Sequence, residues 1–363
     1  MAAASFDRQR DFSGTRAPTG AVAIDGARLA AWMERHVGHF AGPLEIAQFK
    51  GGQSNPTFLL TTPARAYVLR RKPPGVLLPS AHAVDREFRV MSALAAQGFP
   101  VAQPVALCMD ERVIGAMFYI MAHVAGRIIW EPTMPQAHND ERGLVFDAMN
   151  ATLARLHSFA PEALGLGDFG KADNYVLRQI SRWTRQYEAS RTDDIPQMVK
   201  LAAWLPSALP PSRPARLVHG DFRLDNLILD ADQPYIRAVI DWELATLGDP
   251  LADFTYHLMQ WILPPAPSGG GIASLAGVDL ARLGIPLLED YASAYGLRTG
   301  FDPLPHLDFY FAYNLFRLAC ILQGIAGRAR DGTAASSTAE VMFEQIRPLA
   351  QAGWHYAQKA GAR

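Results

Sequence analysis

The chain has 363 residues, of which 49% are hydrophobic and 19% charged, a composition typical of a globular protein with about two domains. Its 34 basic and 35 acidic residues give a formal net charge of −1, so no overall positive field favours nucleic acid as the main partner. The two cysteines exclude a disulfide-rich secreted scaffold and a cysteine-based zinc site, and we expect the protein to work in the reducing cytoplasm.

The amino-terminal residues 1–20 are predicted to form a flexible tail. Charged residues interrupt this segment, so it lacks the apolar core of a signal peptide. Elsewhere the most apolar helical candidate is 309–327, which contains Asn314, Arg317 and Gln323. We therefore expect a buried helix there and no membrane span.

Residues 21–124 are predicted to form a small antiparallel sheet with one packed helix. Segments rich in Leu, Ile, Val, Phe and Tyr mark five strands, and apolar residues at helical spacing mark a helix between the third and fourth. The predicted strands are 44–49, 57–62, 66–71, 104–109 and 115–124, and the apolar face of the helix covers 88–95. This order of elements indicates an α+β unit.

Residues 125–363 are predicted to be mainly helical, because apolar residues recur at helical spacing after the last strand. The exception is 216–241, which contains three short strand-like runs. If this segment folds back as a hairpin centred near Gln233, Asn226 and Asp241 fall opposite each other at its open end.

Three oxygen-bearing side chains in that segment predict a metal-dependent site. Asp221 follows a short strand, Asn226 lies five residues later, and Asp241 follows the last strand-like run. Carboxylate and amide oxygens suit Mg²⁺, which also needs phosphate oxygens and water to complete its octahedron. Phosphoryl transfer uses such an ion together with one carboxylate that orients the attacking hydroxyl.

The segments LVHGDFRLDNLILD (217–230) and AVIDWE (238–243) resemble the catalytic loop and metal segment of the aminoglycoside phosphotransferase and choline kinase family. The resemblance implies a protein-kinase-like two-lobed fold. It implies that Asp221 is the catalytic base, that Asn226 and Asp241 bind Mg²⁺, and that the amino-terminal lobe binds ATP. Gly220 stands where protein kinases have the Arg of H-R-D, which argues against a protein kinase.

A glycine-containing loop between the first two predicted strands is the candidate phosphate-binding loop. Adjacent glycines let backbone N–H groups approach a phosphate, and a serine hydroxyl can assist. The residues predicted to bind the nucleotide in this loop are Gly51, Gly52, Ser54 and Asn55.

Arg70 stands where the family usually has the Lys that holds the α and β phosphates. Arginine can bind phosphate with two N–H groups, so we favour Arg70, while Lys72 shares its strand face and remains an alternative. The resemblance pairs this cation with Glu87 on the next helix. It also places adenine against backbone groups near Met121 to His123.

Four further residues are predicted to surround the catalytic loop. Asp249 and Asp253 follow the metal segment, and we expect both to brace the loop by accepting backbone N–H bonds. His157 is predicted to be a partly buried, hydrogen-bonded histidine. Arg223 either reaches substrate or phosphate, or is an ordinary exposed arginine.

A polycationic aminoglycoside would require an acidic pocket, and the residues after Asp241 show no acidic surplus outside the motif. Aromatic residues are dense between Phe301 and Phe316, so an apolar or acyl-bearing acceptor is favoured. Segments such as GGQSNPTFLL further resemble the kinase-like domain of acyl-CoA dehydrogenase family members ten and eleven, over about residues 25–355. That resemblance implies a hydroxyacyl-CoA or a similar hydroxylated carboxylic acceptor.

The leading hypothesis is therefore an ATP- and Mg²⁺-dependent small-molecule O-phosphotransferase. The alternative is a catalytically weak, pseudokinase-like protein that binds a nucleotide or an acyl ligand, motivated by the non-lysine residue at position 70. A third hypothesis is a hydrolase or another metal enzyme that uses the same carboxylates. The sequence leaves the acceptor, the choice between ATP and GTP, and the oligomeric state open.

Overall fold

The computed structural model describes residues 8–18, 20–51, 55–73, 83–265, 272–330 and 338–363. Its contacts divide the chain into two units. Unit 1 comprises Met1–Trp130 with Leu224–Ala245, and unit 2 comprises Glu131–Arg223 with Thr246–Arg363.

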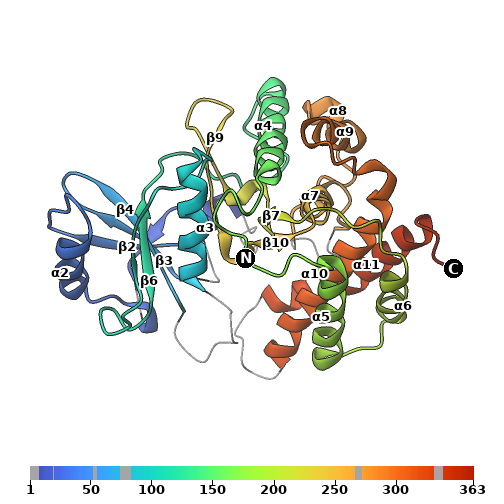
Figure 1. The fold of residues 1–363 in the computed structure, drawn as a ribbon, viewed down its shortest axis with the longest axis horizontal. Helices are drawn as coiled ribbons and strands as arrows, with labels where there is room; N and C mark the ends of the chain where they lie inside the picture. Colours follow the sequence, from blue (N-terminus) through green and yellow to red (C-terminus); the bar gives the residue numbers. More distant parts are fainter. Residues whose placement is uncertain (1–7, 19, 52–54, 74–82, 266–271, 331–337) are drawn as a thin grey trace, which may run out of the picture. The chain divides into compact units, whose positions relative to one another are not determined.

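Unit 1 contains a six-stranded antiparallel sheet, which Figure 1 shows in blue to green. In sheet order its strands are β1 (Thr15–Arg16), β2 (Glu45–Phe49), β3 (Thr57–Thr61), β4 (Ala66–Arg71), β6 (Phe118–Ala122) and β5 (Pro104–Cys108). The five predicted strands are confirmed, and β1 extends the sheet beyond β2.

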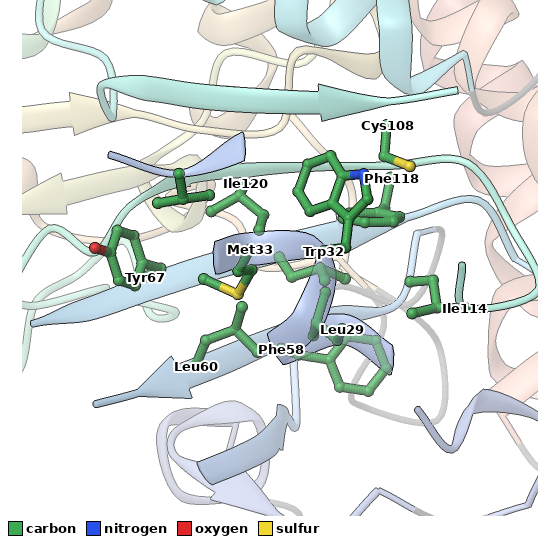
Figure 2. Packing of buried hydrophobic residues seen from close by; sticks show 12 residues of the cluster. Leu29, Trp32, Met33, Phe58, Leu60, Tyr67, Cys108, Ile114, Phe118 and Ile120 are labelled. Atoms are coloured by element: carbon green, nitrogen blue, oxygen red, sulfur yellow. The ribbon is translucent and has the colours of Figure 1, made fainter. Parts of the chain in front are cut away.

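Helix α2 (Gly26–His36) covers one face of this sheet. Leu29, Trp32 and Met33 form its apolar stripe and pack against Phe58 of β3 and Phe118 of β6, as Figure 2 shows. Each such large apolar side chain stabilises the fold by roughly 1.5–3 kcal/mol when fully buried. The prediction of a single packed helix is therefore wrong, because α2 is a second one.

Helix α3 (Val84–Ala96) is the predicted helix and lies on the opposite face of the sheet (Figure 1). Side chains alternate along a strand, so the neighbours of the buried Leu69 and Ile120 point away from α2. These neighbours are Arg70 and Tyr119, which are paired in register, and the Tyr119 hydroxyl donates to Glu87 of α3. The α3 face thus carries the polar side chains of Arg70, Tyr119 and Glu87.

The described part of the amino terminus differs from the predicted tail. Helix α1 (Arg8–Phe12) and β1 are attached to the rest of unit 1: Gln9 Nε2 donates to the Ile128 carbonyl at 3.0 Å, and Phe12 lies 5.0 Å from the Trp130 ring. Main-chain pairing with the edge of β2 and this aromatic contact give the segment a defined position.

The hairpin of β8 (Leu227–Leu229) and β9 (Ile236–Val239) belongs to unit 1, although the sequence placed it in the helical region. The backbones of Leu229 and Arg127 exchange two hydrogen bonds of 2.8 Å, and Val239 donates to the Pro100 carbonyl at 2.8 Å. These pairings, which a local pattern does not reveal, shift the predicted boundary between the two lobes. The 3-10 turns η3 (Leu224–Asn226) and η4 (Trp242–Leu244) flank the hairpin.

Unit 2 is mainly helical, as predicted. Its helices are α4 (Asn139–Ser158), α5 (Tyr175–Ser190), α6 (Pro196–Trp204), α7 (Pro250–Leu258), α8 (Leu280–Leu283), α9 (Leu288–Thr299), α10 (Leu307–Arg330) and α11 (Thr338–Lys359) (Figure 1). Two short strands, β7 (Arg216–Val218) and β10 (Thr246–Gly248), pair antiparallel and flank the catalytic-loop segment and the hairpin in the sequence.

Helix α10 is the buried apolar helix that the sequence predicted. Tyr310, Tyr313 and Phe316 are completely buried along it. By length and hydropathy, the stretch 304–327 is the one helix among the described residues that could cross a membrane, and 89% of its most apolar window is buried. Such burial is typical of a core helix.

Candidate active site

The catalytic-loop segment begins where β7 ends, and Asp253 of α7 holds it. One carboxylate oxygen of Asp253 accepts the backbone N–H of His219 at 2.8 Å, and the other accepts that of Gly220 at 2.8 Å. Gly220 has φ +86°, a conformation that favours glycine, so the chain can turn sharply before Asp221. Asp253 therefore braces the loop as the sequence predicted.

His157 of α4 supports Asp253 from the other side. Its Nε2 donates to Asp253 Oδ2 at 3.1 Å, and its Nδ1 accepts from the Tyr295 hydroxyl at 2.7 Å. Burial favours the neutral acid, but the hydrogen bonds from His157 and from the backbone N–H of His219 outweigh it and keep the pKa of Asp253 below its ordinary value. His157 is hydrogen-bonded as predicted, and it is fully rather than partly buried.

Asp249 has a different role from the predicted one. Its carboxylate accepts the Leu251 N–H at 2.8 Å, which caps α7, and accepts the Tyr310 hydroxyl at 2.5 Å. These bonds fix α7 to α10 rather than bracing the catalytic loop, because position 249 precedes the helix directly and acts as its N-cap.

Asp221, the predicted base, is partly exposed and has polar neighbours in unit 2. Arg223 Nε lies 3.9 Å from Asp221 Oδ1, and Arg223 is itself about one third exposed (36%). Tyr256 of α7 is the second neighbour: burial, the charge of Asp221 and a hydrogen bond with it raise the pKa of the Tyr256 hydroxyl. Arg317 of α10 donates to the Gly220 carbonyl at 2.9 Å and stacks on Tyr256.

Sequence reasoning missed the role of Tyr256 and Arg317 beside this loop. A usable signal existed for Arg317, because a charged residue interrupts the otherwise apolar helix 309–327. A buried charge needs a partner, so such a residue indicates either a buried polar network or a functional site.

Asn226 and Asp241, the predicted metal ligands, lie at the same end of the β8–β9 hairpin. Leu227 pairs with Val239, and the Ile240 N–H donates to the Asn226 carbonyl at 3.0 Å, as expected for a hairpin centred near residue 233. Asp241 has φ +66°, and its side chain is 25% exposed. The predicted hairpin geometry is confirmed, while the metal role of both residues stays a prediction.

The chemistry of this donor set fits a magnesium ion. One carboxylate and one amide oxygen are ligands that Mg²⁺ accepts when phosphate oxygens and water complete its shell. Within the described residues, no three or more His, Cys, Asp or Glu side chains form a ready-made metal cluster.

Arg70, the predicted phosphate cation, contacts three carboxylates in unit 1. Its Nε lies 2.9 Å from Glu87 Oε2, its Nη2 lies 3.3 Å from Glu243 Oε2, and the same nitrogen makes a closer contact with Asp241 Oδ1. Burial lowers the pKa of Arg70, but the carboxylates, Glu87 first, outweigh it and raise that pKa. The predicted pairing of Arg70 with Glu87 is present.

Asn55 and Glu87 lie deep in the same cluster. Asn55 is completely buried, and its Nδ2 donates to Glu87 Oε1 at 2.9 Å and to Glu243 Oε2 at 3.1 Å. Burial is the main cause that raises the pKa of Glu87, against the opposing charge of Arg70. The sequence assigned Glu243 to the motif without a role and assigned Asn55 to the nucleotide loop. The structure brings Glu243 to Arg70, and it brings Asn55 to Glu87 and Glu243.

Of the remaining nucleotide-binding predictions, Gly52 and Ser54 lie outside the described residues. Gly51 is described, and a Cβ added there would lie 3.1 Å from two carbons of the Trp130 ring. Lys72 makes no side-chain ion pair with any residue the structure describes, so it remains an alternative to Arg70 as a phosphate ligand.

The predicted adenine contact near Met121 to His123 meets a physical constraint. The N–H of Ala122 donates to the Gln103 carbonyl at 2.8 Å, and that of His123 donates to the Ala66 carbonyl at 3.2 Å. A nucleotide base cannot use these two donors while the sheet keeps them. Any adenine contact in this segment would have to use other backbone groups.

Comparison with known proteins agrees with this arrangement. Residues 45–307, more than two thirds of the chain, match the phosphotransferase enzyme family (APH). The chain belongs to the phosphotransferase enzyme family. This membership confirms the resemblance drawn from the H-G-D-x-x-x-x-N and I-D-W-E segments, and it supports a small-molecule kinase.

Two relatives are of special interest. The mouse (Mus musculus) acyl-CoA dehydrogenase family member 10 is 42% identical over 350 residues, which cover 96% of this chain and 33% of that protein. The mouse acyl-CoA dehydrogenase family member 11 is 40% identical over 340 residues, covering 91% and 43%. The predicted resemblance to both is confirmed. The chain spans less than half the length of each.

Solved phosphotransferase structures share the fold. A Ralstonia eutropha protein described as a candidate aminoglycoside phosphotransferase is 47% identical, with a TM-score of 0.84 over 93% of this chain and 99% of the other. An aminoglycoside phosphotransferase bound to ADP and hygromycin B is 16% identical, with a TM-score of 0.57 over 92% and 98%. The predicted α+β, kinase-like fold class is confirmed.

Proposed function

We propose that the protein transfers the γ-phosphate of ATP, bound as its magnesium complex, to a hydroxyl group of a small molecule. The observation that carries this proposal is the β8–β9 hairpin, which holds Asn226 and Asp241 at one end, with Asp241 in contact with Arg70. Oxygen ligands for a cation next to a guanidinium suit a nucleotide polyphosphate. Membership of the phosphotransferase family supports the same reaction class.

In this proposal Asp221 orients the acceptor hydroxyl and takes its proton. The acceptor oxygen forms a bond to the γ-phosphorus while the bond from that phosphorus to the bridging oxygen of ADP breaks. Asp253 keeps Asp221 in place through the backbone of residues 219 and 220. When bound by Asn226 and Asp241, Mg²⁺ would neutralise negative charge on the phosphates.

For the acceptor, we favour a hydroxyacyl-CoA or a related hydroxylated carboxylic acid over an aminoglycoside. The two curated relatives named above belong to the acyl-CoA dehydrogenase family by name, which supports an acyl-bearing acceptor. The sequence after Asp241 also lacks the acidic surplus that would attract a polycation.

The test is a phosphate-transfer screen with labelled ATP across hydroxyacyl-CoAs, hydroxy acids, amino alcohols and aminoglycosides. For the best acceptor, Asp221→Asn should lower kcat by about 10²–10⁴ while ATP affinity stays within about threefold. Asp173→Asn, which changes an exposed aspartate of the same unit, is the matched control. Unchanged turnover in Asp221→Asn would reject its role as base.

The alternative of a nucleotide-binding pseudokinase is favoured by one observation. Arg70 already contacts three carboxylates, so its charge is shared before any phosphate binds. ATP binding without transfer to any acceptor class, together with identical behaviour of wild type and Asp221→Asn, would support this alternative over the kinase.

A further inference from the structure

The contacts of Arg70 form a closed ring that leaves Asp241 outside. Arg70 Nε faces Glu87, Glu87 accepts from Asn55, Asn55 donates to Glu243, and Glu243 returns to Arg70 Nη2. Asp241 contacts the ring at Arg70 Nη2. The ring thereby connects Arg70 of β4 and Glu87 of α3 to Glu243 in the turn η4 that follows β9.

Burial separates the ring from Asp241. The side chains of Glu87 and Arg70 are 1% and 8% exposed, and Asn55 is completely buried. Glu243 is 18% exposed and Asp241 is 25% exposed. The ring is thus the more protected part of the cluster, and Asp241 is its most accessible carboxylate.

The ring also explains why arginine rather than lysine fits at position 70. Two nitrogens of one planar guanidinium meet two different acids, Glu87 through Nε and Glu243 through Nη2. A lysine ammonium is a single point charge, which cannot occupy both nitrogen positions at once. Exchange of Arg70 for lysine would therefore open the ring on one side.

Resting on the function proposed above, we propose that Glu243 is a positioning residue that retains Arg70 when Asp241 turns to a divalent cation. Arg70 Nη2 is shared between Asp241 and Glu243, so Asp241 can leave while Glu243 keeps the guanidinium in place. Without Glu243, Arg70 Nη2 would rely on Asp241 alone and would compete with the cation for that carboxylate.

The experiment is a titration of Mn²⁺ in the presence of ADP and without acceptor, followed by electron paramagnetic resonance. Glu243→Gln should weaken Mn²⁺ binding about tenfold and raise the Mg²⁺ concentration for half-maximal transfer by a similar factor. At saturating Mg²⁺ its kcat should stay within about threefold of the wild type, a split that a general loss of structure would not produce.

Three variants accompany this measurement. Glu243→Asp keeps the charge and should restore part of the Mn²⁺ affinity. Arg70→Lys should weaken Mn²⁺ binding by a smaller factor in the Glu243→Gln background than in the wild type, because the ring is already open. Glu45→Gln, an exposed glutamate of the same unit, should leave binding unchanged.

The outcomes separate this inference from the proposed function. Wild type that binds no Mn²⁺ with ADP would reject the metal role of Asp241, and with it both proposals. If Glu243→Gln binds Mn²⁺ as tightly as the wild type, the inference about Glu243 is overturned while the proposed function stands. If circular dichroism shows that Glu243→Gln is unfolded, the Glu243→Asp and Arg70→Lys variants test the inference instead. Mn²⁺ affinities equal to that of the wild type in both variants would overturn the inference about Glu243.

Discussion

His157 and Asp253 meet through a buried hydrogen bond of 3.1 Å, although they are 96 residues apart in the sequence. Asp253 uses the same carboxylate to hold the backbone N–H groups that precede Asp221. The catalytic-loop segment is therefore attached to α4 and α7 through one acidic side chain.

Removal of that acid should destabilise the fold strongly. Asp253→Ala leaves two buried N–H groups and His157 without their acceptor, so the free energy of unfolding should fall by on the order of 3–5 kcal/mol. Urea denaturation monitored by circular dichroism measures this loss. Asp173→Ala, at an exposed site of the same unit, is the control. A loss below about 1 kcal/mol would contradict the bracing role.

Arg317 is predicted to position the catalytic loop through the Gly220 carbonyl, which it contacts at 2.9 Å. If the protein is a kinase, Arg317→Lys should lower kcat about 10–100-fold, because a small displacement of the loop moves Asp221 from its working position. The KM for ATP should change less than about threefold. Steady-state kinetics with Arg185→Lys, an exposed arginine of unit 2, as control would show this split. Equal changes in both constants would argue for a general structural defect.

Gly51 leaves little room for a side chain beside Trp130. A Cβ at position 51 would lie 3.1 Å from two ring carbons of Trp130 and 3.3 Å from the Phe12 carbonyl oxygen. Because Trp130 must shift by a few tenths of an ångström to admit a Cβ, Gly51→Ala should lower the free energy of unfolding by about 1 kcal/mol. The smaller ring of Trp130→Phe should recover part of this cost in the double variant.

Thermal or urea unfolding of the wild type, Gly51→Ala, Trp130→Phe and the double variant gives the coupling free energy between positions 51 and 130. Gly38→Ala is the control, since a Cβ there meets open space. Strictly additive effects of the two substitutions would contradict the predicted steric contact.

Stability should also depend on pH through His257. Burial lowers the pKa of this histidine from 6.5 to about 4, and its Nε2 lies 2.8 Å from the Tyr291 hydroxyl. Between these values the unfolded chain binds a proton that the folded chain does not. The contribution of His257 to the free energy of unfolding is therefore fully present above pH 6.5 and is lost as the pH falls toward 4. Between pH 7 and pH 5 the free energy of unfolding should fall by about 2 kcal/mol for this reason.

Urea unfolding at pH 7 and pH 5 tests this dependence. The difference between the two pH values should be about 2 kcal/mol smaller in His257→Gln than in the wild type. His138→Gln, at an exposed histidine of the same unit, should behave like the wild type. The same pH difference in wild type and His257→Gln would reject the assignment.

The sequence alone predicted those features that depend on neighbouring residues. Segments rich in Leu, Ile, Val, Phe and Tyr marked the strands. Asn226 and Asp241 lie on either side of the predicted turn near Gln233, so antiparallel pairing places both at one end of the hairpin. Family membership followed from motifs of the same local kind. The bracing by Asp253 joins residues 34 positions apart, and it was expected from the family's pattern.

Tertiary structure alone decided the contacts between distant segments. Asn55 and Glu243 are 188 residues apart, and only packing of the hairpin in unit 1 brings their side chains together beside Arg70. Helix α2 and the amino-terminal strand likewise became visible only through what they pack against. The physical reason is that a local pattern determines only the direction in which a side chain points. Which distant residue it contacts is determined when tertiary packing buries the two side chains against each other.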